Sequence, residues 1–305
     1  MAEDRVAIVT GASSGIGEAS ARALATAGFR VAVAARRAER LEELAKGIGE
    51  TGGEALAVPV DLADEDATRR LVRRTLDAFG RIDVVLNNAG FSPAAALEQL
   101  PRSEVRRTFE VNLLAGLQLI GEVTPVMRAQ GGGRILNMSS LASRVPAPLA
   151  VAYSATKAGI EAATGCLRLE LSSWNIELAL IVPGFVDTPT FDNSRAMGAA
   201  LRADPQNPYR QLMFDLDAFA KSQLDGALAP EDVATVVVKA ATDRRLRARY
   251  YAPRSARLQS GLLGALPASW LDRILLRLYK VPAPQAPAER RRPDQRLRST
   301  TLPIE

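Results

Sequence analysis

Short apolar runs alternate with longer segments of helical pattern along most of the chain. The apolar runs are rich in Val, Ile, Leu and Ala, which is typical of strands buried on both faces of a sheet. They lie at 6–9, 30–35, 55–60, 82–87, 134–139 and 176–182. Segments of helical pattern lie between them, among others at 18–28, 38–50 and about 64–79. This alternation predicts an α/β fold of the Rossmann type, in which a doubly wound parallel sheet has helices on both faces and forms three layers.

The segment 188–228 interrupts the alternation. It is long and contains several prolines and aromatic residues between a strand end and a helix that is expected to begin at Pro230. Connections longer than about 15 residues are uncommon and are often functional. We therefore expect a substrate lid within a single domain that covers residues 1–253.

The segment 254–280 has the pattern of an amphipathic helix. Trp270, Ile274 and Leu278 share one helical face, whereas Asp272 and the basic side chains lie on the other. This extension could pack on the core or on another protomer; alternatively, it could cover a substrate tunnel or contact a membrane surface through 255–280. Residues 281–305 are rich in Pro and Arg without periodicity, which predicts a disordered tail.

The composition excludes several classes of function. The formal charge is +5, and much of the excess lies in the tail, without a basic stripe elsewhere, so no nucleic acid partner is expected. The absence of histidine excludes Ser-His-Asp and Cys-His mechanisms. With one cysteine in addition, no catalytic zinc site and no bound metal are expected. Cys166 lies in an apolar helical pattern and is expected to be a buried structural thiol.

The chain also lacks the signals of export and membrane insertion. It begins with MAEDR and has no basic and apolar leader, and it contains no uncharged apolar run of about 18 residues. We expect a cytoplasmic protein, with membrane association only through the extension.

A glycine-rich turn, TGASSGIG at 10–17, follows the first strand and opens a helix. Glycine lets the backbone approach a pyrophosphate closely, and the N-terminus of the helix offers unpaired N–H groups. A tight connection without a ligand remains the alternative. If the turn binds a dinucleotide, its contact residues are Gly11, Ser13, Ser14, Gly15, Ile16 and Gly17.

Three further positions indicate which dinucleotide could bind. Arg36, after the second strand, could pair with a 2′-phosphate, which favours NADP(H) over NAD(H); a solvated arginine is the alternative. Asp61, next to Leu62, could accept a hydrogen bond from adenine, or could form an Asx turn or helix cap. The ribose is expected beside Asn88, Ala89 and Gly90.

The motif Tyr153-x3-Lys157 places a phenol and an ammonium on the same face of a helix, in a chain with only five lysines. A free phenol has a pKa near 10, and a nearby positive charge favours the phenolate. The pair could therefore perform acid/base chemistry, or it could be an ordinary exposed helix pair.

Taken together, TGASSGIG, NNAG at 87–90, Asn112, Ser140, Tyr153-x3-Lys157 and PGFVDT at 183–188 closely resemble the classical short-chain dehydrogenase/reductase family. The resemblance covers roughly residues 4–255. The apolar lid and the amphipathic end resemble those of retinol and hydroxysteroid dehydrogenases. The chain departs from the family in its addition beyond about Pro253. It also departs in Ser14, where NADP-selective members often have a basic residue.

The resemblance implies a role for each matching residue. Tyr153 would be the catalytic acid/base, Lys157 its activator and a ribose contact, and Ser140 the hydrogen-bond partner of the substrate oxygen, with Ser139 as the fallback. Asn112 would be a link to a proton relay. Taken alone, Asn112 could be a polar helix residue, Ser140 a polar strand end and Thr188-Pro189 a plain turn. The nicotinamide and pyrophosphate would contact Pro183, Gly184, Val186 and Thr188.

The expected function is that of an NADP(H)-dependent oxidoreductase that interconverts a carbonyl and an alcohol on a hydrophobic small molecule. The resemblance further implies a homodimer or homotetramer. The alternative is a regulatory or scaffold protein that has kept the fold and binds NADP(H) without turnover.

Overall fold

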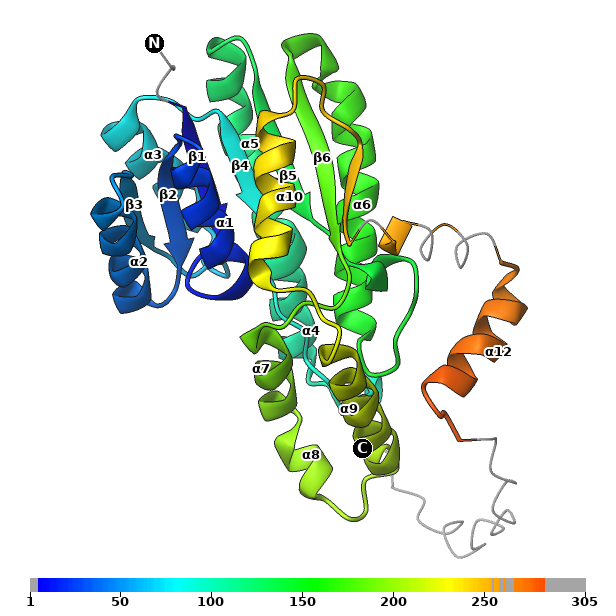
Figure 1. Ribbon diagram of the computed structural model, residues 1–305. Coiled ribbons are helices and arrows are strands. Elements are labelled where there is room, and N and C mark those ends of the chain that lie inside the picture. Colours follow the sequence, from blue (N-terminus) through cyan, green and yellow to red (C-terminus); the bar gives the residue numbers. More distant parts are fainter. Residues whose placement is uncertain (1–4, 254, 258–260, 262–265, 283–305) are drawn as a thin grey trace, which may run out of the picture.

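The computed structural model describes residues 5–253, 255–257, 261 and 266–282. Within these residues the strands form one 7-stranded sheet in the order β3-β2-β1-β4-β5-β6-β7 (Figure 1). Every neighbouring pair is parallel. The strands are β1 (Val6–Thr10), β2 (Arg30–Ala35), β3 (Ala55–Pro59), β4 (Val84–Asn87), β5 (Gly133–Met138), β6 (Ile176–Pro183) and β7 (Arg249–Ala252).

The six strands that the apolar runs predict are all present, with small differences at their ends. The sequence did not predict β7, because it is a short edge strand whose burial alternates instead of being continuous. It pairs only with β6, through a register that places Tyr250 opposite Ile181.

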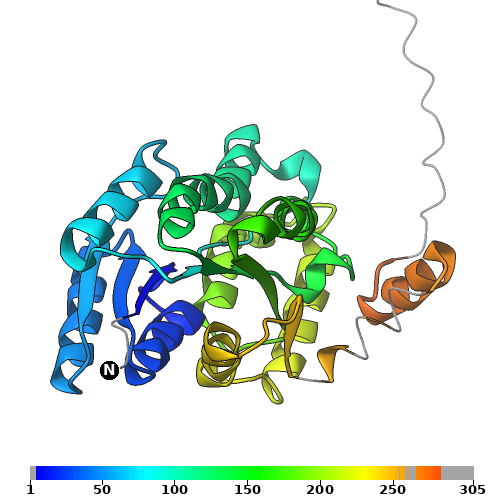
Figure 2. The same cartoon turned by 90° about the horizontal axis from the view of Figure 1, so that it is seen from above.

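Helices cover both faces of the sheet, as the end-on view in Figure 2 shows. Alternate residues of β1 point to opposite faces: Ala7 and Val9 belong to one apolar cluster, whereas Val6 and Ile8 belong to the other. The first cluster includes residues of α1 (Gly15–Thr26), α2 (Ala38–Glu50) and α10 (Pro230–Thr242). The second includes residues of α3 (Ala67–Phe79) and α5 (Ala115–Ala129). The doubly wound three-layer fold is therefore confirmed.

The helix before α5 contains a π turn. Helix α4 (Arg102–Phe109) continues without a break through η2 (Glu110–Leu114), which has π geometry, into α5. The π turn carries Asn112, which is buried. Helix α6 (Val151–Glu170) packs beside this segment, so the two helices bring Asn112, Tyr153 and Lys157 to the same end of the sheet. Two short 3-10 turns, η1 (Leu97–Gln99) and η3 (Leu141–Ser143), belong to this region, whereas η4 (Ser172–Trp174) follows the other end of α6.

The segment 188–228 is mostly helical rather than a long loop. It forms α7 (Pro189–Met197), α8 (Ala199–Ala203) and α9 (Arg210–Leu224), which lie together below the sheet in Figure 1. Asp217 of α9 is buried and lies 3.1 Å from Arg195 and 3.2 Å from Arg202, measured between hydrogen-bonding atoms. A 2.6 Å hydrogen bond from Gln99 to Asn207 joins this helical segment to η1. Prolines at 205 and 208 interrupt the helical pattern, which explains why the sequence does not reveal these helices.

The C-terminal amphipathic helix is α12 (Ala268–Leu278), which lies to one side of the three layers (Figures 1 and 2). Leu275 and Tyr279 are buried, and the Tyr279 ring meets Phe219 of α9 edge to face at 5.3 Å. In contrast, Trp270 is 61% exposed, and Ile274 and Leu278 are also exposed. The C-terminal end of α12 thus contacts α9 through Tyr279, whereas the face that carries Trp270 is exposed.

One prediction from the sequence was wrong. Cys166 is exposed rather than buried, because it lies on the outer side of α6, where the apolar pattern does not face the sheet. Most of the predicted tail, at 283–305, lies outside the described residues. None of the helices in the described ranges is long and apolar enough to cross a membrane.

Candidate active site

The predicted site residues gather at the carboxyl edge of the sheet. Because all strands are parallel, the segments that follow β1, β4, β5 and β6 begin at the same edge. In open α/β sheets, ligands bind outside this edge, at the point where the strand order reverses. Here the reversal lies between β1 and β4, the two strands that precede the glycine turn and NNAG.

The glycine turn has no room for side chains at its three glycines. Gly11 has a φ of +67°, and a Cβ there would lie 2.8 Å from the Cα of Ala89. A Cβ on Gly17 would collide with the carbonyl of Gly11, and one on Gly15, where φ is +58°, would lie 3.1 Å from Thr188. The turn can therefore pack this closely against the NNAG loop and Thr188 only with glycine at these positions.

The N-terminus of α1 is a second feature that fits an anion. Ser14 is the N-cap residue, but its side chain makes no capping hydrogen bond. The first backbone N–H groups of α1 therefore have no side-chain cap, and the helix dipole favours a negative charge there. Ile16 follows within this first turn and packs against the apolar cluster under the sheet, while Ser13 is only partly buried.

Asn88 and Ala89 are fixed by β1. The backbone N–H groups of both residues donate to the Thr10 hydroxyl, at 3.0 and 3.1 Å. The Asn88 amide donates to the Thr10 carbonyl at 3.0 Å. Gly90, which follows, is exposed, and a Cβ on it would lie 3.3 Å from the amide oxygen of Asn112. The segment after β4 is thus held close to the glycine turn.

Arg37, rather than Arg36, contacts the glycine turn. Its guanidinium donates to the Ser13 hydroxyl at 2.9 Å, to the Ser14 hydroxyl at 2.9 Å and to the Ser13 carbonyl at 3.1 Å. Arg36 is exposed. Ser14 stands where NADP-selective members of the family often have a basic residue, and Arg37, which follows β2, brings a positive charge to that position.

Asp61 forms the Asx turn that was one of its two interpretations. Its carboxylate accepts a 3.0 Å hydrogen bond from the backbone of Ala63, and its other oxygen lies 3.7 Å from Arg107. Leu62 is buried beneath it. One carboxylate oxygen is therefore committed to the turn, and a contact with adenine could use only the other.

Ser140, Tyr153 and Lys157 converge beyond β5. The Ser140 side chain lies close enough to the Tyr153 phenol to favour its charged form, and Lys157 Nζ lies 5.7 Å from the centroid of the Tyr153 ring. Lys157 is 4% exposed and donates to the Met138 carbonyl. Burial lowers the pKa of Lys157 to about 8. The adjacent Ser139 hydroxyl points elsewhere and donates to Glu161.

The Tyr153 phenol does not have a lowered pKa, although Lys157 lies close to its ring. Burial raises its pKa above the ordinary value, and the nearby Ser140 side chain only partly offsets this effect. The distance to the ammonium and the removal of water explain the difference, because burial disfavours the charged phenolate.

Asn112 uses its side chain to hold the loop that follows β4. Its amide oxygen accepts from the Phe91 N–H at 3.0 Å, and its amide nitrogen donates to the Phe91 carbonyl at 2.7 Å. The same nitrogen lies 3.4 Å from the Thr156 hydroxyl. With its amide occupied in this way, Asn112 holds the NNAG loop against α6.

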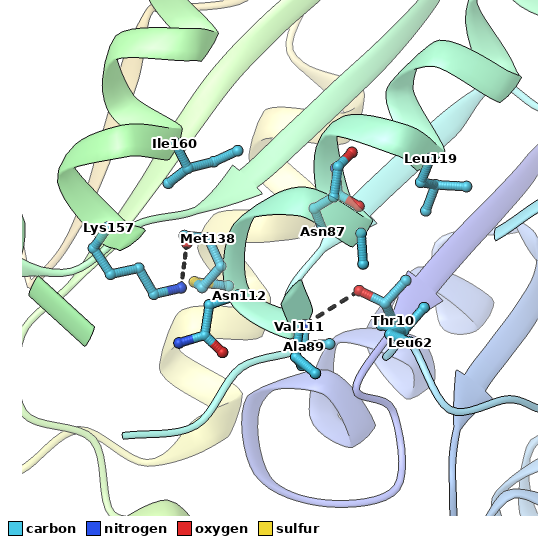
Figure 3. Close-up of a pocket in the computed structure, with 12 residues that line it drawn as sticks. Thr10, Leu62, Asn87, Ala89, Val111, Asn112, Leu119, Met138, Lys157 and Ile160 are labelled. Carbon is cyan, nitrogen blue, oxygen red and sulfur yellow. Dashed lines mark hydrogen bonds between the residues drawn. The ribbon is translucent and has the colours of Figure 1, made fainter. Parts of the chain in front are cut away.

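A small cavity lies behind these residues (Figure 3). Its volume is about 10 Å³, and its wall includes Asn87, Asn112, Met138 and Lys157. This volume is on the order of a single water molecule. The cavity therefore has room for about one water molecule, and a substrate must bind outside it.

The loop after β6 closes the other side of the site. The Gly184 N–H donates to the Ala252 carbonyl of β7 at 2.7 Å, and Val186 forms a parallel bridge with Leu228. Pro183 is the last residue of β6, and Thr188 occupies the N-cap position of α7, without a side-chain capping hydrogen bond, beside Gly15. β7 and the connection between α9 and α10 thus fix the position of this loop relative to the glycine turn.

Sequence reasoning missed three residues of this region: Thr10, Arg37 and Glu161. For Arg37 the sequence offered a signal, because Arg36 and Arg37 are adjacent after β2. For Glu161 the signal was its position four residues after Lys157, on the same helical face. Within the described ranges, no group of three or more acidic or cysteine side chains could hold a metal ion.

Comparisons with known proteins agree with this geometry. The family model of the short chain dehydrogenases matches residues 5–199. A cis-4-hydroxycyclohexanecarboxylate dehydrogenase from Sinomonas cyclohexanicum is 35% identical over 79% of this chain and 90% of its own length. A metagenomic short-chain oxidoreductase, solved in complex with NADP, shares 31% identity and a TM-score of 0.65, over 81% of this chain and 96% of its own.

A short chain dehydrogenase/reductase from Burkholderia phymatum, solved in complex with NAD, shares 26% identity and a TM-score of 0.73, over 85% of this chain and 92% of its own. The neighbours therefore include both an NADP and an NAD complex. The resemblance to retinol and hydroxysteroid dehydrogenases in particular is not specifically shown by these matches. On the family match, the relatives and the fold, this chain belongs to the short-chain dehydrogenase/reductase family and is an NAD(P)-dependent oxidoreductase.

Proposed function

We propose that this protein interconverts a carbonyl and an alcohol on a hydrophobic small molecule with NADP(H) as cofactor. The observation that carries the proposal is the convergence of Ser140, Tyr153 and Lys157 at the edge of the sheet that also carries the glycine turn. A binding protein without turnover would not need a buried lysine beneath a tyrosine, because burying its charge costs stability.

The residues present fit a dinucleotide. The glycines at 11, 15 and 17 allow the pyrophosphate to approach, and the uncapped N-terminus of α1 favours its charge. The segment 183–188 would hold the nicotinamide end, with Thr188 beside Gly15. Bound NADP(H) supplies or accepts the hydride, and its oxidised ring adds a positive charge.

The side chains supply the proton chemistry. In reduction, Tyr153 would give its phenolic proton to the substrate oxygen while Ser140 donates a hydrogen bond to the same oxygen. Lys157, whose pKa near 8 lies close to neutrality, would return a proton to Tyr153. The small cavity at Asn112 and Lys157 would connect this exchange to water.

Arg37 favours NADP(H) over NAD(H). Its guanidinium lies against the Ser13 and Ser14 hydroxyls, where it could pair with a 2′-phosphate, and Arg36 is adjacent and exposed. Two arginines at the end of β2 replace the acidic residue that would hydrogen-bond the ribose of NAD.

A hydrophobic substrate is supported by the aromatic side chains beyond the loop after β6. Phe185 is 44% exposed and meets Phe219 edge to face at 6.0 Å. Phe219 in turn contacts Tyr279, so aromatic side chains extend from the loop over α9 to the C-terminal extension. Such a surface would favour an apolar molecule next to the reacting oxygen.

A direct experiment tests the proposal. The absorbance of NADPH is followed with panels of steroid, retinoid and aryl ketones, for the wild type and for Tyr153→Phe. We expect turnover by the wild type and none by the variant. The variant should bind NADPH with the same affinity as the wild type. Tight NADPH binding without turnover on any carbonyl would favour the regulatory or scaffold alternative, and turnover by the variant would remove Tyr153 from the chemistry.

A peripheral contact with an anionic lipid surface is a second proposal. The exposed apolar face of Trp270, Ile274 and Leu278 lies next to Arg273 and Arg277, a combination typical of helices that lie in a membrane interface. The test is sedimentation of the full chain with anionic phospholipid vesicles. We expect binding by the wild type and its loss in Trp270→Ser/Ile274→Ser; binding that survives these changes would contradict the proposal.

We further propose a cytoplasmic homodimer or homotetramer. Leu114 of the π turn and Leu169 of α6 are 45% and 80% exposed, on helices that lie beside each other on one face of the sheet. Light scattering of the purified protein would determine its mass, and a monomer at micromolar concentration would contradict this proposal.

A further inference from the structure

A buried carboxylate lies directly behind the proposed catalytic residues. Glu161 follows Lys157 by one turn of α6, so Tyr153, Lys157 and Glu161 lie on one helical face. The Glu161 side chain is only 9% exposed. Its first carboxylate oxygen is 2.8 Å from the Ser139 hydroxyl and 2.8 Å from the Ser143 hydroxyl.

The second oxygen of Glu161 is paired with two arginines. It accepts a 2.8 Å hydrogen bond from Arg249 of β7 and lies 3.3 Å from Arg144. Burial by itself would favour the neutral acid, but the hydrogen bonds from Ser139 and Ser143 and the charge of Arg249 outweigh it, so the pKa of Glu161 lies below its ordinary value. The group is therefore a carboxylate at neutral pH.

The two serines that Glu161 holds are placed on either side of Ser140. Ser139 comes directly before it, and Ser143 lies in the 3-10 turn η3 that follows. The Ser143 hydroxyl is also 2.7 Å from the Ser140 carbonyl, so its single proton is shared between Glu161 and the backbone of Ser140. Ser140 in turn accepts from the Ala142 N–H at 3.1 Å, which orients its hydroxyl.

We propose that Glu161 is a positioning residue that fixes the Ser140 hydroxyl against the Tyr153 phenol by anchoring the backbone on both sides of Ser140. This inference rests on the proposed function, because it assigns Glu161 an effect through Ser140. Hydrogen bonds to a charged carboxylate are stronger than neutral ones, so they can hold a short turn in one position. Arg144 and Arg249 offset the cost of burying that charge.

The position of Ser140 affects the acidity of Tyr153. The Ser140 side chain favours the charged form of the phenol, so it lowers the Tyr153 pKa and opposes the effect of burial. Besides Ser140, the charged Lys157 lies near the ring. Its hydrogen bond to the Met138 carbonyl does not involve Glu161, so a change at Glu161 should not move it. If Ser140 moves away, the phenol therefore loses a partner of its charged form, and its pKa rises further.

The test is Glu161→Gln, which keeps the size of the side chain and removes its charge. Removal of a hydrogen-bond donor to a reacting oxygen typically costs about 10²–10³ in kcat, so displacing Ser140 without removing it should cost roughly tenfold. In alcohol oxidation, the ascending limb of the pH profile of kcat/KM should move to higher pH. The dissociation constant of NADPH, measured by fluorescence without turnover, should stay within about twofold of the wild type.

A double-mutant cycle separates positioning from a merely structural role. If Glu161 acts through Ser140, adding Glu161→Gln to Ser140→Ala should cause no further loss of kcat. Equal losses in both backgrounds, or a fall in melting temperature without the shift in the pH profile, would overturn the inference. A wild-type rate in Ser140→Ala would also overturn the inference, because Ser140 would then have no role for Glu161 to support. The proposed function itself would fail only if the wild type showed no turnover, which distinguishes the two failures.

Two further variants complete the experiment. Glu177→Gln is the matched control, because Glu177 also pairs with a partly buried arginine, Arg134, at 3.1 Å, but at the opposite end of β6. Glu177→Gln should leave the rate and the pH profile unchanged.

A second variant applies if Glu161→Gln does not fold. Ser139→Ala/Ser143→Ala keeps the Glu161 carboxylate paired with its arginines, and it should show the same loss of kcat and the same shift of the pH profile. A wild-type pH profile in that variant would contradict the inference.

Discussion

The ammonium of Lys157 donates a 2.7 Å hydrogen bond to the carbonyl of Met138, the last residue of β5. This contact holds a nearly buried positive charge at the carboxyl edge of the sheet, where Lys157 is only 4% exposed. Burial lowers its pKa from 10.5 to about 8. The charged form of Lys157 therefore destabilises the fold, although the side chain is held beside Tyr153. A charged group that is kept at a cost in stability is typical of a functional site.

Replacing Lys157 should reveal this cost as a pH-dependent gain in stability. Between pH 8 and 10.5 the folded wild type binds fewer protons at Lys157 than the unfolded chain, so its stability rises with pH in this window. Lys157→Met should therefore be more stable than the wild type at pH 7, by about 2 kcal/mol after allowing for the lost hydrogen bond. Its activity should be abolished.

Melting temperatures of the wild type and of Lys157→Met, measured from pH 7 to 10, check this prediction. The advantage of the variant should be greatest at pH 7 and 8 and should shrink toward pH 10. An advantage that does not change with pH would show that packing, rather than the buried charge, is responsible.

Arg37 should decide the preference for NADPH. Its guanidinium lies 2.9 Å from both Ser13 and Ser14, so Arg37→Ala should weaken NADPH binding about tenfold or more, whereas NADH binding should change little. Arg36→Ala is the matched comparison, because its side chain is exposed and adjacent. Calorimetric titration with both nucleotides measures the ratio. A larger effect of Arg36→Ala would support the assignment made from the sequence instead.

Gly17 should not tolerate even a methyl group. A Cβ at this position collides with the Gly11 carbonyl, so Gly17→Ala should displace the glycine turn, at a cost of about 1–3 kcal/mol. We expect NADPH affinity to fall at least about tenfold. Gly49→Ala is the control, because a Cβ at that position in α2 meets nothing within 4 Å. Unchanged affinity in Gly17→Ala would show that the nucleotide does not use this turn.

Tyr279 should contribute to stability, whereas Trp270 should not. The Tyr279 ring is 8% exposed and packs on Phe219, so Tyr279→Ala should lower the free energy of unfolding by about 2 kcal/mol or more. Trp270→Ala, at 61% exposure on the same helix, should change it by less than about 0.5 kcal/mol. Urea denaturation measures both values. A large loss in Trp270→Ala would indicate that its face is covered, for instance by another copy of the chain.

Most of the fold could be predicted because its signals are local. The apolar runs of β1 to β6 and the helices at 38–50 and 230–242 follow from residues that are close in sequence. The edge strand β7 and the helices of 188–228 could not be predicted in the same way. β7 pairs with β6, which lies some 70 residues before it in the sequence. In the segment 188–228, Asp217 of α9 holds the helices together by pairing with arginines that lie 15 and 22 positions before it.

The candidate site divides in the same manner. The glycine turn and Tyr153-x3-Lys157 are motifs in which the spacing itself determines the geometry, and the sequence alone was enough to select them. Arg37 meets Ser13 across 24 positions, and Glu161 meets Arg249 across 88. Only the tertiary structure could reveal these contacts, because the folding of the sheet brings the residues together. The structure likewise decided that burial raises the pKa of the Tyr153 phenol and lowers that of the Lys157 ammonium, since removal from water depends on the packing of the whole chain.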